Sequence, residues 1–147
     1  MRRVVLFGTF DLLHPGHLYA IRLARRQGDH LTIAVARDET VKKEKGHLPV
    51  FRARERKKML EALRMVDRVV IGDENGSWRI LRALQPHVIC IGYDQQASHP
   101  GLTSALPHLK ISPRIVRLPP FAPRRLKSSK LCLSLLPHHN STRRKRR

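Results

Sequence analysis

Short apolar runs that alternate with helix-like segments are the feature that most constrains the fold of this chain. The apolar runs are residues 4–7, 31–36, 68–71, 88–91 and 115–118. Apolar side chains recur at helical spacing between them, in residues 16–27, 52–64, 77–84 and 103–109. This alternation is typical of βαβ units, in which helices cover both faces of a parallel sheet. The sequence therefore predicts an α/β fold, a single domain with a doubly wound parallel sheet of five strands.

The loops after the five expected strands are where a ligand is expected to bind. In open parallel sheets, ligands bind beyond the carboxyl ends of the strands. Parallel strands share one direction, so these loops should lie along a single edge of the sheet. They follow Phe7, Ala36, Ile71, Ile91 and Leu118.

The loop after the first strand carries the most informative motif. Gly8-Thr9-Phe10-Asp11 is followed by His14-Pro15-Gly16-His17, which opens a helix. Backbone N–H groups in such a turn point toward an anion, and two imidazoles add donors for phosphate oxygens. Gly16 has no Cβ, so a phosphate chain can approach the backbone closely. The motif predicts a phosphate site; the alternative is that His14 only caps the helix and His17 is a surface residue.

These two tetrapeptides resemble the signature of the cytidylyltransferase-like nucleotidyltransferases. That group includes glycerol-3-phosphate cytidylyltransferases and archaeal FAD synthases, and the resemblance runs from about residue 2 to residue 130. It implies a Rossmann-like domain that transfers a nucleotidyl group to a phosphorylated acceptor and releases pyrophosphate. It also implies that the nucleotide is bound by Gly8, Thr9, Phe10, His14 and His17, with Asp11 on the acceptor side.

A lysine-rich segment follows the second expected strand. In the family that the motif resembles, a lysine of this loop contacts the triphosphate and the acceptor phosphate. Lys45 is assigned to that role, since Gly46 would let the loop fold over the site; Lys42 and Lys43 are the competing choices. A solvated basic loop is the alternative. In the role that the resemblance implies, the lysine would offset the repulsion between the triphosphate and the acceptor phosphate.

Arg56 lies near the start of the charged segment 52–64. The resemblance places it on the acceptor side of the site. It could brace the site or pair with Asp11 or Asp38, and a surface ion pair of little energetic value is the alternative.

The expected fourth strand ends in Gly92-Tyr93-Asp94-Gln95. In the resembled family this position surrounds the base and ribose of the nucleotide. Gly92 and Asp94 are therefore assigned to the nucleotide, with Asp94 accepting a hydrogen bond from ribose or base. The tetrapeptide is more similar to archaeal FAD synthases than to cytidylyltransferases, and it is the feature that favours a flavin acceptor.

A basic, serine-containing segment near the C-terminus resembles the family's pyrophosphate-binding segment. Arg125, Ser128 and Ser129 are its candidate ligands. Serine is a favourable N-cap, and a helix N-terminus stabilises phosphate. A merely hydrophobic terminus is the alternative, because Pro137 soon ends any helix that begins here.

Charges of both signs occur up to Asp94, and only positive charges follow it. The formal net charge is +19, all 11 acidic residues lie at or before Asp94, and residues 143–147 are all Lys or Arg. We expect a nucleotidyltransferase domain over 1–136 and a basic, disordered tail over 137–147. The tail could contact nucleic acid non-specifically.

The remaining expectations concern compartment and assembly. Cys90 and Cys132 show neither metal-ligand spacing nor a disulfide framework, which favours the cytoplasm. No apolar run is long enough to span a membrane, and the N-terminal run is too short for a signal peptide. A homodimer is expected by analogy only. No dedicated metal site is visible, so Mg²⁺ (or another divalent cation) would arrive with the nucleotide.

The preferred function is therefore transfer of AMP from ATP to FMN, which forms FAD and releases pyrophosphate. An alternative with the same chemistry uses CTP with glycerol 3-phosphate or another small phosphorylated alcohol. An alternative of another class is an inactive nucleotidyltransferase fold that binds nucleic acid.

Overall fold

The computed structural model describes residues 1–74, 77–93 and 101–121 of the chain. The described part contains five strands and five helices. In chain order they are β1 (Arg3–Gly8), α1 (Pro15–Arg25), β2 (His30–Val35), α2 (Asp38–Lys45), α3 (Ala53–Glu61), β3 (Arg68–Ile71), α4 (Arg79–Leu84), β4 (Val88–Ile91), α5 (Leu102–Leu109) and β5 (Arg114–Arg117). No helix among these residues is both long and apolar enough to cross a membrane.

The five strands form one parallel sheet in the order β3-β2-β1-β4-β5. The predicted doubly wound α/β domain is thereby confirmed. The chain winds outward from β1 to β3 and then crosses back to β4, on the other side of β1. The loops after β1 and β4 consequently diverge at the middle of the sheet. This is the switch point at which such folds bind ligands.

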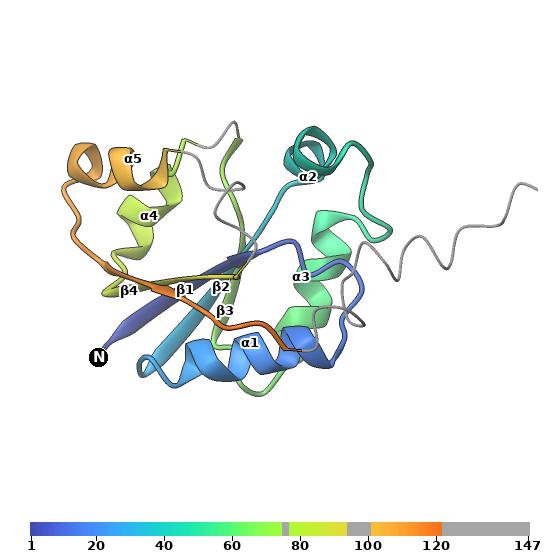
Figure 1. The fold of residues 1–147 in the computed structure, drawn as a ribbon, viewed down its shortest axis with the longest axis horizontal. Coiled ribbons are helices and arrows are strands. Elements are labelled where there is room, and N and C mark those ends of the chain that lie inside the picture. Colours follow the sequence, from blue (N-terminus) through green and yellow to red (C-terminus); the bar gives the residue numbers. More distant parts are fainter. Residues whose placement is uncertain (75–76, 94–100, 122–147) are drawn as a thin grey trace, which may run out of the picture.

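Helices cover both faces of the sheet, because successive strand side chains point to opposite sides. Val4 and Leu6 of β1 face α1 and α3, and this core layer also contains Ile21 and Leu60. Val5 and Phe7 face α4 and α5, where the second core layer includes Leu81, Leu84, Leu102 and Leu106. Figure 1 shows α1 and α3 on one side of the strands and α4 and α5 on the other. The three central strands β1, β2 and β4 are buried on both faces, as parallel strands usually are, whereas the edge strand β5 is largely exposed.

One segment differs from the sequence-based expectation. Residues 38–45, which were expected to form a loop around the lysines, form helix α2. Asp38 and Glu39 in its first turn and three lysines in its last turn complement the helix dipole. Gly46, in the left-handed conformation (φ 80°), ends it. Apolar periodicity could not reveal this helix, since Val41 is its only buried residue.

Smaller differences concern helix boundaries. Helix α4 begins at Arg79 rather than at residue 77, because Trp78 is its N-cap, at φ 57°. The expected helix over residues 127–136 and the division between a domain over 1–136 and a tail over 137–147 lie outside the described residues.

Candidate functional site

His14 both caps helix α1 and faces the second histidine of the motif. Its Nδ1 accepts a hydrogen bond from the backbone N–H of Gly16 at 3.1 Å. A neutral His14 therefore carries its proton on Nε2, which can donate to a ligand. The rings of His14 and His17 are stacked with centroids 3.8 Å apart. The two imidazoles thus form one unit at the carboxyl end of β1.

His17 lies deeper than His14, and its surroundings keep it neutral. Burial lowers the pKa of His17 to about 3, with smaller contributions from the neighbouring charges of His14 and Lys45. The nearby Asp11 carboxylate and a hydrogen bond to the Leu12 backbone oppose this shift. Burial also lowers the pKa of His14. Both imidazoles are therefore neutral near pH 7 without a ligand. A bound anion would raise the pKa of each, because it stabilises the protonated form.

Gly16 is required by the histidine itself. A Cβ at this position would come within 2.8 Å of Cε1 and 2.9 Å of Nδ1 of His14. From the sequence, we expected this space to admit a phosphate chain. In the structure the missing Cβ makes room for the capping ring of His14, so the glycine sets the orientation of the histidine pair.

Phe10 gives the loop after β1 its shape. It is buried, adopts a left-handed conformation (φ 52°), and packs against His17 with ring centroids 5.3 Å apart. Its ring also covers Gly8, where a Cβ would approach Phe10 Cε2 to 2.5 Å. Phe10 and Gly8 therefore act on the site by shaping the loop that carries the histidines.

Lys45 approaches the histidines from a different element, the last residue of helix α2. Its charge is close enough to lower the pKa of His17 further, and neither Lys42 nor Lys43 is among the groups that act on this histidine. The loop placement expected for Lys45 was wrong, because residues 38–45 are helical. The contact of Lys45 with the phosphates stays a prediction.

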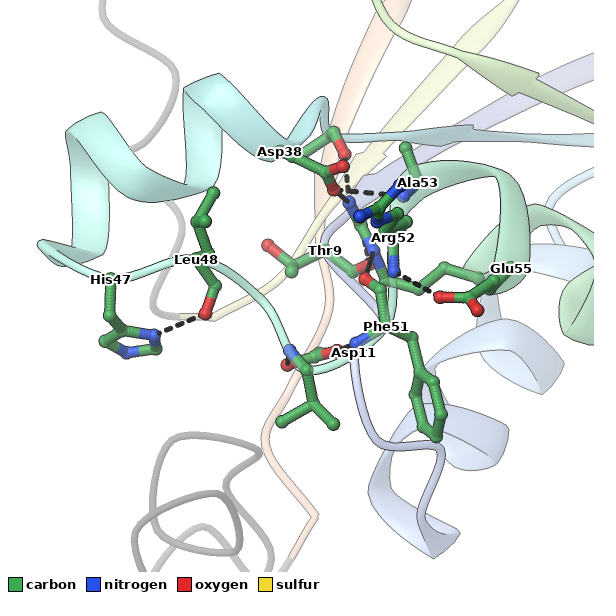
Figure 2. A network of polar contacts seen from close by, with 12 residues as sticks. Thr9, Asp11, Asp38, His47, Leu48, Phe51, Arg52, Ala53 and Glu55 are labelled. Carbon is green, nitrogen blue, oxygen red and sulfur yellow. Dashed lines mark hydrogen bonds and ion pairs between the residues drawn. The ribbon is translucent and has the colours of Figure 1, made fainter. Parts of the chain in front are cut away.

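Arg56 is the most deeply buried charged residue of the site, with no exposed surface. Its guanidinium donates to Asp38 Oδ1 at 2.7 Å, which confirms one of the two ion pairs considered from the sequence. It also donates to the carbonyls of Thr9 and Phe51, and Figure 2 shows these two residues and Asp38 in one network of polar contacts. An arginine without exposed surface cannot present its guanidinium to an acceptor, so the expected acceptor contact is corrected to a bracing role.

Asp11 likewise faces inward. Its two carboxylate oxygens accept hydrogen bonds from the N–H groups of Val50 and Phe51, at 2.8 Å and 2.9 Å, and the residue is 3% exposed. The expected direct contact with an acceptor does not fit this burial. Asp11 instead ties the loop after β1 to the segment between α2 and α3. Sequence reasoning missed Val50 and Phe51, because backbone donors leave no signal in residue type.

Gly92 follows β4 and so lies across the switch point from the histidines. Asp94, Arg125, Ser128 and Ser129 lie outside the described residues. The last described residue, Phe121, packs on Tyr19 of α1 with ring centroids 5.0 Å apart. Its carbonyl oxygen lies close to Gly16. The chain therefore enters its C-terminal segment beside the histidine motif.

Trp78 and Cys90 have packing roles near the strands. Trp78 contacts Phe7 edge-on, with ring centroids 5.4 Å apart. Cys90 is fully buried in β4, and burial raises the pKa of its thiol to about 12. A thiol of this kind is not a nucleophile, as expected from the sequence.

The described residues contain no cluster of three or more His, Cys, Asp or Glu side chains that could hold a metal ion. Mg²⁺ binds phosphates and water readily and needs few protein ligands.

Comparison with known proteins agrees with the geometry. Residues 5–132 match the family described as cytidylyltransferase-like. An FAD synthase from Methanosphaerula palustris is 39% identical over 130 residues, which are 88% of this chain and 84% of the relative. An FAD synthase from Pyrococcus abyssi is 42% identical over 118 residues, 80% of each chain.

Solved structures show the same arrangement of elements. A lipopolysaccharide core biosynthesis protein from Thermoplasma volcanium superimposes with a TM-score of 0.75 at 34% identity, covering 82% of this chain and 98% of that one. A pantothenate synthetase from Thermus thermophilus has a TM-score of 0.58 at 16% identity, over 89% of this chain and 67% of that one. The second likeness concerns the fold alone.

Proposed function

Because the chain belongs to the cytidylyltransferase-like family and, within it, to the FAD synthases, we propose that it transfers AMP from ATP to FMN. The products are FAD and pyrophosphate. The phosphate of FMN attacks the α-phosphorus of ATP, and the bond to the β-phosphate breaks. The observation that carries the proposal is the stacked pair of His14 and His17 at the switch point of the sheet.

The histidine pair would bind the triphosphate and stabilise the transition state. Charge accumulates on the oxygens of the α-phosphate during the transfer, and fixed donors lower the energy of that state. His14 Nε2 is oriented for this because its Nδ1 is held by Gly16. The backbone groups of Gly8 and Thr9, at the end of β1, would complete the phosphate site.

Lys45 would bring the two phosphates together. FMN and the triphosphate are both anionic, so their approach costs electrostatic energy that an ammonium group offsets. Lys45 is suited to this because its charge already acts on His17 in the absence of ligand. Mg²⁺ would neutralise further charge on the phosphate oxygens and would be held by the nucleotide.

The C-terminal segment would hold the outgoing pyrophosphate through Arg125, Ser128 and Ser129. Support comes from Phe121, which brings the chain to the start of α1, four residues before Arg125. Gly92 and Asp94 would contact base and ribose, across the switch point from the histidines. The domain would then include residues up to 136, and the family match to residue 132 supports this boundary.

A panel of substrate pairs tests the proposal. The protein is incubated with Mg²⁺ and either ATP plus FMN or CTP plus glycerol 3-phosphate, and pyrophosphate is measured. We expect release from the first pair. Release from CTP and glycerol 3-phosphate alone would assign the alternative substrates. No release from any pair, together with salt-sensitive RNA binding, would favour the nucleic-acid-binding alternative.

Three further properties remain proposals. The basic residues 137–147 would contact nucleic acid non-specifically, on the basis of their charge alone. The cytoplasm is the proposed location, on the basis of the two isolated cysteines. A homodimer is proposed by analogy with the family.

A further inference from the structure

Helix α2 carries Lys45 but has little apolar anchoring of its own. Val41 is its only buried residue, and six of its eight residues are charged. Figure 1 shows the helix beyond the end of β2, above α3 and not against a face of the sheet. Apolar packing therefore contributes little to the orientation of α2. Something else must fix the position of Lys45 relative to the histidines.

Polar contacts hold the start of α2. Asp38, its first residue, accepts hydrogen bonds at Oδ1 from Arg56 Nη2 at 2.7 Å and from the Ala53 N–H at 2.9 Å. Arg56 Nη2 also donates to the carbonyl of Ala36 at 2.8 Å. These bonds join the first turn of α2 to the first turn of α3, as Figure 2 shows for Asp38 and Ala53.

The same guanidinium reaches the loop that leads to the histidines. Arg56 Nη1 donates to the carbonyl of Thr9 at 2.7 Å, and its Nε donates to the carbonyl of Phe51 at 2.9 Å. The Phe51 N–H in turn donates to Asp11. One buried arginine therefore joins the loop after β1, the start of α2 and the segment before α3. A guanidinium is suited to this because its donors are fixed in a plane.

We propose that the Arg56–Asp38 pair is a positioning device that fixes Lys45 on α2 against His14 and His17. Neither residue touches a substrate; both act by fixing α2, and with it Lys45, relative to the loop after β1. The inference rests on the proposed function, since Lys45 must have phosphates to contact. Misplacement of a reacting group by about 1 Å can cost about a hundredfold in rate, so a small tilt of α2 would be measurable.

Asp38→Asn is the most direct variant. Asparagine keeps an oxygen that can accept from Arg56 and Ala53, but it removes the charge that orients the guanidinium. Asp67→Asn is the matched control. Asp67 pairs with Arg25 and accepts from the Leu31 N–H, at the opposite edge of the sheet. We expect both variants to lower the melting temperature, and only Asp38→Asn to lower kcat, by about tenfold.

A double variant shows whether the pair acts through Lys45. Lys45→Ala alone removes the ammonium group. If Asp38 acts by positioning this group, Asp38→Asn combined with Lys45→Ala loses no more activity than Lys45→Ala alone. Losses that multiply would overturn the proposal, as would equal losses of kcat in Asp38→Asn and Asp67→Asn.

ATP affinity, measured by calorimetry in the presence of Mg²⁺, tests the positioning role independently of which acceptor the protein uses. Asp38→Asn should weaken ATP binding by about the same factor as Lys45→Ala, with no further loss in the double variant. This holds whether or not FMN is the acceptor, so failure of FAD formation alone contradicts only the proposed function. Unchanged ATP affinity in Asp38→Asn, with weakened affinity in Lys45→Ala, would overturn the positioning role.

Ala53→Pro serves as a second variant if Asp38→Asn does not fold. It removes the Ala53 N–H, which donates a hydrogen bond to Asp38, while both charges of the Arg56–Asp38 pair remain. Proline is favoured at the first position of a helix, and Arg52 before it has the extended conformation (φ −64°, ψ 156°) that proline requires. We expect a smaller loss of kcat than in Asp38→Asn, again absent in combination with Lys45→Ala. Unchanged kcat here would contradict the proposal.

Discussion

Two aspartate–arginine pairs lie at opposite edges of the same sheet, and they differ in what surrounds them. Arg56 and Asp38 lie at the carboxyl ends of the strands, with side chains 0% and 26% exposed. Arg25 and Asp67 lie at the amino ends, with side chains 38% and 34% exposed. Asp67 also accepts the Leu31 N–H, so this pair closes the entry to β2.

The difference teaches how the same ion pair can serve two purposes. The exposed pair is solvated and contributes little beyond local order. In the buried pair the guanidinium of Arg56 has lost its water, and it depends on Asp38 and three backbone carbonyls for compensation. Such an arrangement is costly to break and holds neighbouring loops in one geometry. The buried pair lies at the edge that carries His14 and His17, whereas the exposed pair lies at the opposite edge.

The largest effect on activity is expected from His17. His17→Ala should lower kcat by about 10²- to 10³-fold, because it removes a donor to the transition state. His30, which lies near Asp67 at the other edge, is the matched control, and His30→Ala should leave kcat within about twofold of the wild type. Initial rates of pyrophosphate release are the measurement. Equal losses of kcat in His17→Ala and His30→Ala would contradict a functional difference between the two edges.

Removal of each arginine sharpens the contrast in stability. Arg56→Met should lower the free energy of unfolding by about 3–5 kcal/mol, since it strands a carboxylate and three carbonyls. Arg25→Ala should lower it by less than about 1 kcal/mol. Urea unfolding of both variants and of the wild type gives the comparison. A small loss in Arg56→Met would mean that water replaces the guanidinium easily.

Acid should destabilise the histidine edge in particular. The pKa of His17 is lowered in the folded chain to about 3, from an ordinary value of 6.5, so the unfolded chain binds the proton more tightly. The stability due to neutral His17 is thus complete above pH 6.5 and is lost as the pH falls toward 3. The loss between pH 7 and pH 4 should be up to about 3 kcal/mol.

His17→Gln, which cannot titrate, is the control for this pH dependence. The free energy of unfolding of the wild type should fall more steeply between pH 7 and pH 4 than that of His17→Gln. Parallel curves would show that His17 is protonated normally in the folded chain, and would contradict the lowered pKa.

A smaller effect is expected from Gly16→Ala. The new methyl group would meet the His14 ring, which must rotate and lose its hydrogen bond to the backbone. We expect about a tenfold loss of kcat with a change of less than about 1 kcal/mol in stability, since alanine favours the helix. The kcat and the melting temperature are measured together. Unchanged kcat would show that the orientation of His14 does not matter.

The fold and the histidine motif could be predicted because they depend on local patterns. Val4 to Phe7 and the other buried strands are apolar on both faces, and His14, Gly16 and His17 occur within four residues. Helix α2 could not be predicted in this way. Its stability comes from end charges and from polar contacts with distant residues rather than from an apolar stripe.

The bracing role of Arg56 was equally hard to predict. Its partners include the carbonyls of Thr9, Ala36 and Phe51, and a carbonyl is present at every residue. Only the pairing with Asp38 had a signal in residue type. The acceptor roles expected for Asp11 and Arg56 were wrong for a related reason, because burial of a charged side chain depends on long-range packing that the motif does not encode.

The site around His14 and His17 is proposed to transfer the adenylyl group of ATP, which includes the α-phosphate, to FMN with release of pyrophosphate. The most direct measurement follows the label of [α-³²P]ATP in the presence of FMN and Mg²⁺. We expect the wild type to move the label into FAD and His17→Ala to do so at least about a hundredfold more slowly. Label that remains in ATP, or that reaches FAD equally fast in His17→Ala, would contradict it.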